Sequence, residues 1–135
     1  MHGLLSQPEV GFVLVTSPSP IAIDEVLAFH ERLHAESMPV AGLVANRVTP
    51  ELWPPAEPLP GATELGAAAA AAGVDGAALG ARLAATLADH QALAASDRRA
   101  LSRLFALVDV PRAVVPRLET DVHDLAGLAR LGEQL

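Results

Sequence analysis

Apolar and polar residues follow one another in blocks that predict a strand, a helix and a second strand near the N-terminus. Residues 12–16 (FVLVT) form a continuous apolar run rich in β-branched side chains, typical of a strand in a parallel sheet. Apolar positions recur at helical spacing over 20–36, where Ser19 is a plausible N-cap and Pro20 a plausible first helical residue. Because residues 40–46 (VAGLVAN) form a second apolar run, the three segments predict a βαβ unit.

The middle of the chain breaks this pattern. Residues 50–76 form a connector rich in Pro, Ala and Gly, and its first part, 50–60, holds five prolines that no regular element can cross. Its second part, 62–76, fits either a mobile loop or a weak helix. Helical spacing of leucines then runs over 77–108, with a possible break at Ser96.

The C-terminal part predicts one more strand and one more helix. Residues 113–116 (AVVP) form a third apolar run, and Thr120 can cap a last helix that continues to the C-terminus. The order of elements predicts an α/β fold in a single domain over 1–135, with a partial parallel sheet of about three strands and flanking helices. Such a sheet leaves a strand edge open, which indicates part of something larger.

Composition and charge exclude several functions. The chain has no cysteine, and all nine of its basic residues are arginine, so zinc–thiolate sites, cysteine nucleophiles and phosphate-gripping lysines are excluded. A net charge of −7 argues against a nucleic-acid partner. No apolar stretch is long enough to cross a membrane, and the N-terminus lacks the pattern of a signal peptide. We therefore expect a cytoplasmic protein without a transmembrane segment.

The sharpest short motif is His30-Glu31-Arg32-Leu33-His34, which matches H-E-x-x-H. Histidines four residues apart share one face of a helix and can bind zinc, with the Glu polarising a bound water. A catalytic site needs a third protein ligand, and no second half of a zincin signature follows. We expect His30 and His34 on the sheet-facing side of the helix as ordinary hydrogen-bonded residues, and a metal site only if the zinc interpretation holds.

Two segments fall at the carboxyl ends of predicted strands, where open α/β sheets bind ligands. Asn46 follows the second strand, and an Asn amide can accept from adenine N6 and donate to N7. Pro116, Arg117 and Leu118 begin the loop after the third strand, which can form a wall of a base pocket. The plainer interpretations are a turn-capping Asn and an ordinary βα turn. The turn over 16–20 has two prolines and no glycine, so it predicts a capped turn and not a phosphate cradle.

The order and spacing of these segments resemble the C-terminal part of the ArsA-type ATPases, the family of the arsenite-pump ATPase and of the ATPase that targets tail-anchored membrane proteins. The similar segments are Phe12–Thr16, Glu25, Glu31–Leu33, Met38–Val40, Asn46–Val48, Gln91 to Phe105, Val115-Pro116 and the helix with Leu125. The resemblance covers roughly four-fifths of the chain. It implies the C-terminal portion of a P-loop NTPase fold of the SIMIBI type.

The resemblance also implies a nucleotide-binding role. It assigns the adenine contact to Asn46 and the loop that closes over the base to Pro116, Arg117 and Leu118. The family's phosphate loop precedes this region and is absent here, so no catalytic residue is assigned. We expect anion-transporting ATPase activity, with ATP and Mg²⁺, only together with a P-loop-containing subunit or a missing N-terminal segment. The family further implies a peripheral link to a membrane protein.

Two other functions remain open. The same fold could serve as a non-catalytic interaction module that pairs with another chain or forms a homodimer. The more remote alternative is a zinc hydrolase built on His30, Glu31 and His34.

Overall fold

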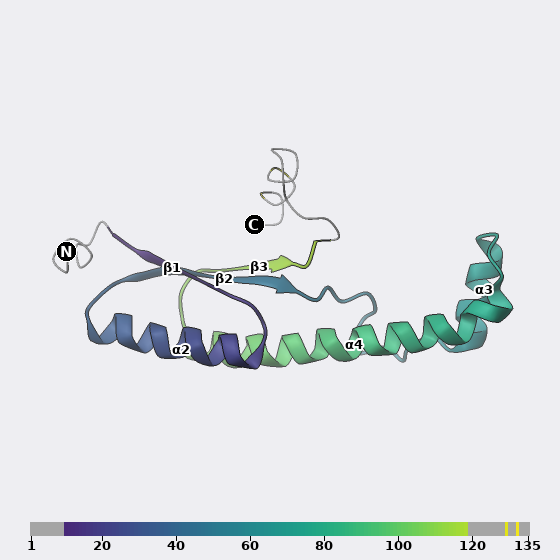
Figure 1. Ribbon diagram of the computed structural model, residues 1–135, viewed down its shortest axis with the longest axis horizontal. Helices are drawn as coiled ribbons and strands as arrows, with labels where there is room; N and C mark the ends of the chain where they lie inside the picture. Colours follow the sequence, from purple (N-terminus) through teal and green to yellow (C-terminus); the bar gives the residue numbers. More distant parts are fainter. Residues whose placement is uncertain (1–9, 119–128, 130–131, 133–135) are drawn as a thin grey trace. The chain divides into compact units, whose positions relative to one another are not determined.

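The computed structural model describes residues 10–118, 129 and 132, and it confirms an α/β architecture with a three-stranded parallel sheet and flanking helices (Figure 1). The elements in chain order are β1 (Phe12–Thr16), α2 (Pro20–Ala35), β2 (Val40–Val48), α3 (Ala62–Ala71), α4 (Gly76–Leu107) and β3 (Arg112–Pro116). The predicted last helix, with its cap Thr120, falls outside the described residues apart from residues 129 and 132.

The sheet has the order β1-β2-β3, with both pairs of strands parallel. Leu14 of β1 lies in register with Leu43 of β2, and Thr16 lies in register with Ala45. All four of these side chains are buried, because they share one face of the sheet. The pairing leaves the outer edges of β1 and β3 without a neighbouring strand among the described residues.

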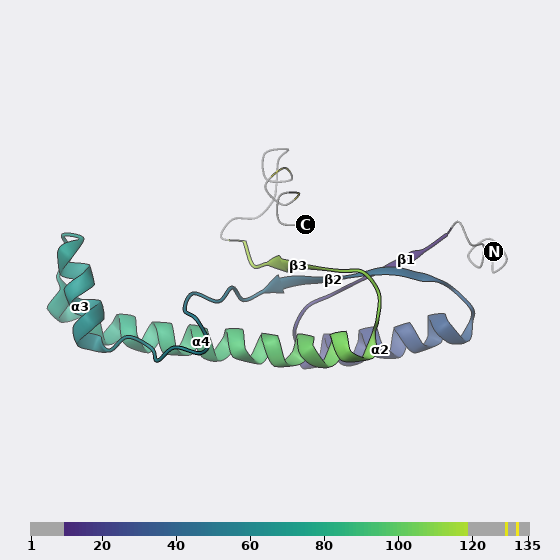
Figure 2. The ribbon, with the colours of Figure 1, turned by 180° about the vertical axis from the view of Figure 1, so that it is seen from behind.

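Helices α2 and α4 lie on the same side of the sheet, as Figures 1 and 2 both show. The core between them and the sheet is built from aliphatic side chains of α2, α4, β1 and β2. Its most deeply buried large residues are Ile23, Leu43, Leu104 and Val108. Because the chain has few aromatic residues, this core relies on branched aliphatic side chains.

The ends of α2 follow from local chemistry that the sequence predicted. Ser19 is the N-cap, with its hydroxyl oxygen accepting from the Ala22 amide at 3.3 Å, and Pro20 is the first helical residue. After the helix, Ser37 adopts a left-handed conformation with φ of 55°, and the Met38 amide donates to the Leu33 carbonyl at 2.8 Å. This turn directs the chain into β2.

The chain forms two compact units. The sheet unit contains the described residues up to Val48 and those from Asp97 onward, whereas residues 49–96 form a second unit within the crossover from β2 to β3. The predicted connector, 50–76, falls in this second unit. No helix or strand crosses 50–60, as the prolines predicted, and 62–71 adopts the helical alternative.

The second unit contains two helices joined by a short turn at Gly73, where φ is +80°. Glycines allow their backbones to approach closely, because a Cβ atom on Gly80 would collide with the Ala62 carbonyl, and one on Gly66 would lie 2.8 Å from the Gly76 carbonyl oxygen. Helix α4 continues without a break through Ser96, although the sequence analysis considered a break there. No Pro or Gly interrupts the helix at this point. Among the described residues, no helix is long and apolar enough to span a membrane.

Candidate functional site

Asn46 lies near the carboxyl end of β2, at an irregularity in the pairing with β3 between Ala45 and Val48. Its side-chain oxygen accepts a hydrogen bond from the Arg47 amide at 2.8 Å, and Arg47 has a positive φ of 60°. This bond identifies the amide oxygen and holds the side chain in one orientation. The side chain of Asn46 is exposed, so its polar atoms can reach a ligand.

The loop that begins at Pro116 lies at the end of the neighbouring strand. Pro116 is in register with Val48, and the Arg117 amide donates to the Val48 carbonyl at 2.8 Å. The tertiary structure therefore brings the two predicted segments, which are far apart in the sequence, to adjacent strand ends. Arg117 and Leu118 are exposed there.

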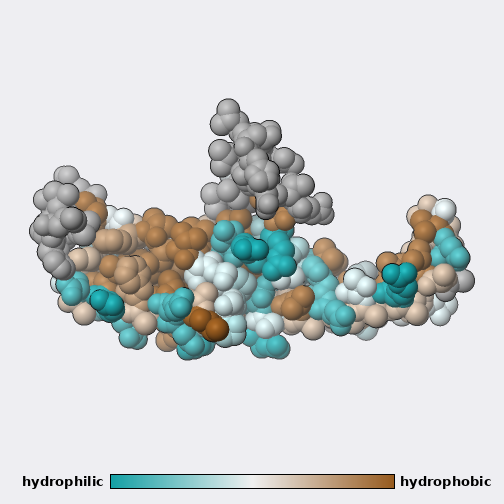
Figure 3. Space-filling view, viewed as in Figure 1, coloured by the Kyte–Doolittle hydropathy of each residue, from teal (hydrophilic) through white to brown (hydrophobic). Residues whose placement is uncertain are grey.

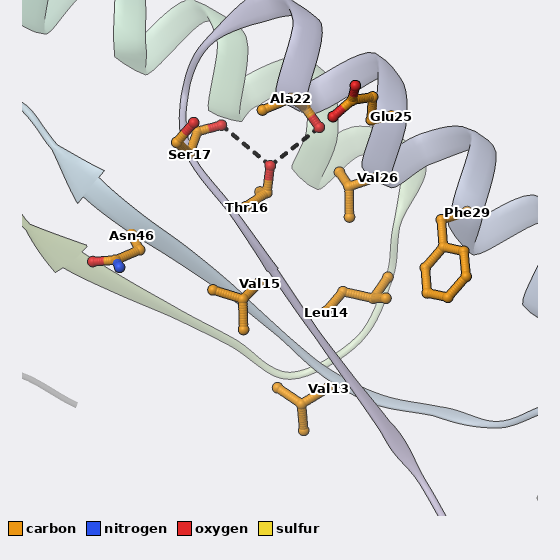
Figure 4. Close-up of a pocket in the computed structure, with 10 residues that line it drawn as sticks. All are labelled: Val13, Leu14, Val15, Thr16, Ser17, Ala22, Glu25, Val26, Phe29 and Asn46. Carbon is orange, nitrogen blue, oxygen red and sulfur yellow. Dashed lines mark hydrogen bonds between the residues drawn. The ribbon is translucent and has the colours of Figure 1, made fainter.

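A hollow of about 520 Å³ borders the outer edge of β1 (Figure 4). One wall is the strand itself, from Val13 to Ser17, and the other is the adjacent face of α2. Asn46 also borders the hollow, whereas Pro116, Arg117 and Leu118 are not among its lining residues. The hollow and the Pro116 loop are thus separate features on either side of β2.

The α2 wall of the hollow is formed by Ala22, Glu25, Val26 and Phe29. Phe29 is 47% exposed, although a helix that covers a sheet normally buries its aromatic residues. Apolar surface gathers in this part of the molecule in the view of Figure 3. The sequence analysis did not single out Phe29, because the helical spacing alone does not tell which apolar residue overhangs a strand edge.

The turn from β1 to α2 has its polar groups committed to the protein itself. The buried Thr16 hydroxyl lies 3.2 Å from the Ser17 carbonyl oxygen and 3.2 Å from that of Ala22, as the dashed lines in Figure 4 show. The Ser19 hydroxyl oxygen accepts a hydrogen bond from the Ala22 amide in the first turn of α2. Pro18 and Pro20 have no amide hydrogen to offer a ligand. This geometry confirms a capped turn, in place of the exposed amides that a phosphate cradle needs.

The H-E-x-x-H residues lie on a flank of α2. His30 and His34 border a hollow of about 480 Å³ that Arg103 and Leu107 of α4 also line, and His34 is exposed. The expectation that both histidines face the sheet is wrong for His34, which is exposed, whereas His30 is half-buried and lies between Val26 and Leu33 along the buried stripe of α2.

The same flank offers little to a metal ion. Across residues 10–118, no three His, Asp or Glu side chains are grouped so as to hold one. Asp24, which lines the same hollow, pairs with Arg103 at 2.9 Å. Of the two distant histidines, His90 has its Nε2 atom 2.7 Å from the Pro50 carbonyl oxygen, and His123 lies outside the described residues. The zinc alternative therefore gains no support from this geometry.

Comparison with known proteins adds no assignment: no family model matches the chain, and no curated protein matches it significantly. The case for a function therefore depends on the residues and geometry described above.

Proposed function

We propose that this chain is the adenine-side part of an ArsA-like ATPase, which binds ATP together with a partner that carries the phosphate loop. The observation that supports this most directly is the convergence of Asn46 and the Pro116 loop at adjacent carboxyl ends of a parallel sheet, joined by the bond from Arg117 to Val48. Ligands of open α/β sheets bind at this edge.

The chemistry of Asn46 suits a purine base. Its oxygen has two lone pairs, so it can keep the bond to the Arg47 amide and still accept from the exocyclic amine of adenine. Its NH₂ group can donate to N7 at the same time. Since the bond to Arg47 fixes the orientation of the side chain, little conformational entropy is lost when a base binds.

The phosphates need the backbone amides and the lysine of a phosphate loop. The chain has no lysine, and the one turn from a strand to a helix N-terminus in the described sheet unit is already capped by Ser19. Phosphoryl transfer requires donors and Mg²⁺ around the phosphates, which the proposed partner supplies when ATP binds. By itself the chain is expected to hold a nucleoside weakly and to leave ATP intact.

The outer edge of β1 is the place where we expect that partner. Within residues 10–118, β1 pairs with β2 alone, and the α2 wall of the hollow beside it holds three apolar residues and Glu25. A strand added at this edge would cover Phe29 and satisfy the unpaired backbone groups of β1. A P-loop subunit, an N-terminal segment preceding this region or a second copy could supply it.

Nuclear magnetic resonance can test the base site directly. Asn46 is the only asparagine in the sequence, so selective ¹⁵N labelling gives one side-chain amide signal. We expect adenosine to shift this signal and guanosine to shift it less, because the Asn46 amide can pair with both N6 and N7 of adenine. A second sample with uniform ¹⁵N labelling adds the side-chain amide of Gln91, in the second unit, as a control signal that should not move.

An Asn46→Ala variant completes this test. If the proposal is right, adenosine shifts the backbone amides of Arg117 and Leu118 in the unaltered chain, and these shifts disappear in the variant. An exposed-site control, Ser102→Ala, should keep them. The proposal would be contradicted if adenosine at millimolar concentration moved none of these signals.

A non-catalytic interaction module is the second candidate, favoured by the exposed apolar side chains at β1. Val13 is 58% exposed and Val15 is 63% exposed, which is unusual in a parallel sheet. In that case the chain should self-associate or bind a partner without nucleotide. Sedimentation at several protein concentrations distinguishes this role from a nucleotide-dependent one. Self-association without nucleotide should be lost in Val15→Asp and kept in Leu107→Asp, a control at a similarly exposed site outside the sheet.

A further inference from the structure

Two exposed arginines lie at the carboxyl edge of the sheet, one at the end of each of two neighbouring strands. Arg47 directly precedes the last residue of β2, and Arg117 directly follows the last residue of β3. The two strands are parallel and end side by side, as Figures 1 and 2 both show. The adenine contact proposed above assigns a role to neither guanidinium.

The backbone fixes the spacing of these two residues. Pro116 lies in register with Val48, and the Arg117 amide donates to the Val48 carbonyl oxygen at 2.8 Å. Arg47 is the residue before Val48, and neighbouring strands of a sheet lie about 4.8 Å apart. Two side chains as long as arginine that start this close together can reach one small ligand beyond the strand ends.

Arg47 has a backbone conformation that is rare for its residue type. Its φ of 60° lies in the left-handed region, which is unfavourable for a residue with a Cβ atom and is more often occupied by glycine or asparagine. It falls at the irregularity of the β2–β3 pairing, where Asn46 and Arg47 lie opposite the single residue Val115. Such bulges redirect side chains and are common beside binding sites.

The end of a helix does not explain this conformation. Ser37, the other described non-glycine residue with a positive φ, follows the C-cap of α2, where left-handed residues are usual. Arg47 lies inside a strand, and its amide is held by the Asn46 side-chain oxygen at 2.8 Å. A glycine would adopt this φ without strain, so the choice of arginine here indicates a use for its side chain.

The strands that form this edge carry only positive charge, although the chain as a whole has a net charge of −7. No Asp or Glu occurs in β1, β2 or β3. The remaining arginine of these strands, Arg112, lies at the opposite end of β3, with its guanidinium 4.6 Å from the centre of the Phe105 ring. A small anion at the carboxyl edge therefore meets two guanidiniums and no carboxylate of the strands.

We propose that Arg47 and Arg117 together bind a phosphate group, in a site that we call the arginine pair. A planar guanidinium presents paired N–H donors that match two phosphate oxygens, so two of them hold a phosphate without lysine. They do not replace the phosphate loop that phosphoryl transfer requires. Inorganic phosphate and a phosphate ester present the same oxygens to this site. The site requires no base, and it therefore goes beyond the adenine contact proposed above.

Nuclear magnetic resonance of the arginine Nε–H groups tests the arginine pair. We expect inorganic phosphate at millimolar concentration to shift the signals of Arg47 and Arg117 but not that of Arg99, an exposed arginine of α4 in the same unit. Sodium chloride at equal ionic strength should shift none of them. AMP that binds more tightly than both adenosine and inorganic phosphate would identify a nucleotide phosphate as the ligand, whereas AMP that binds no more tightly than inorganic phosphate would identify the free anion.

Two variants separate a binding role from a structural one. Arg117→Gln should weaken phosphate binding about fivefold or more, as expected for the loss of one charged pair. Arg47→Gly should weaken binding by a similar factor and yet keep or raise the midpoint of thermal unfolding, because glycine adopts the left-handed conformation without strain. The control Arg99→Gln should leave the affinity for phosphate unchanged.

Three results would overturn the proposal: phosphate shifts no arginine signal, phosphate and chloride shift these signals alike, or either variant binds phosphate as tightly as the control. Failure of this site is distinguishable from failure of the base site. If phosphate bound and adenosine moved no signal, the arginine pair would stand and the adenine contact would not. If adenosine gave shifts and phosphate gave none, the reverse would hold.

Discussion

The close approach of α3 and α4 allows a sharp test, because there helix propensity and packing favour opposite outcomes. Gly80→Ala replaces a glycine inside α4 by the best helix former, which favours the helix by about 1 kcal/mol. The added Cβ atom would collide with the Ala62 carbonyl oxygen and lie 3.2 Å from the Gly66 Cα atom. Both of these neighbours are backbone, so no side-chain rotation can relieve the contact.

The magnitude follows from setting these two effects against each other. Overpacking costs up to about 3 kcal/mol, which leaves a net destabilisation of about 2 kcal/mol after the gain in propensity. This corresponds to a roughly thirtyfold larger opening equilibrium for the helix pair. Helix α3 has 10 residues and no buried side chain, so we expect it to lose its helical structure once it separates from α4.

Hydrogen exchange of the α3 amides, residues 62–71, measures this opening. Gly61→Ala is the matched control, because nothing lies within 4 Å of a Cβ atom at Gly61 and its φ of −76° suits any residue. We expect the control to change α3 protection by less than about 1 kcal/mol. If Gly80→Ala instead slowed exchange in α3, propensity would dominate and the glycine contact would not be what holds the helices together.

Three further changes test the core, the connector and the helix cap. Leu104→Ala should lower the free energy of unfolding by about 2–5 kcal/mol in urea titrations, because this side chain is fully buried. The control Leu107→Ala, at a residue that is 60% exposed, should change the free energy of unfolding by less than about 0.5 kcal/mol. Equal effects of the two variants would place the core elsewhere. Gln91→Ala removes the 2.8 Å hydrogen bond from the Gln91 side-chain nitrogen to the Trp53 carbonyl oxygen. The fluorescence of Trp53, the one tryptophan of the sequence, should then shift toward that of a solvated indole. An unchanged spectrum would contradict the idea that this bond anchors the connector 50–76. Ser19→Ala should cost about 1 kcal/mol of stability by thermal unfolding while Ser19→Asp restores it, and a loss in both variants would exclude the cap as the cause.

Much of the sheet unit could be predicted from local sequence. The run FVLVT gives β1 with the predicted bounds, and Ser19-Pro20 begins α2 as expected, because caps and prolines act through the backbone of their own neighbours. The positions of Asn46 and Pro116 at strand ends also followed from the pattern. Their adenine-binding role stays a prediction.

Other features depended on contacts that are distant in sequence. The surroundings of His30 and His34 could not be read from helical spacing, because Arg103 and Leu107 of α4 line the hollow that both histidines border. The continuity of α4 through Ser96 was likewise not decided by the spacing of its leucines, although no Pro or Gly interrupts the helix there. A polar stretch on an exposed helix side does not interrupt a helix.

The sequence by itself determined the kinds of elements, their order and the absence of any lysine or cysteine. Only the tertiary structure decided which strand ends meet, that both helices cover the same face, and that β1 keeps an open edge beside Phe29. The physical reason is that periodicity and capping are properties of neighbouring residues, whereas register and the covering of a sheet are set by the burial of side chains far apart along the chain.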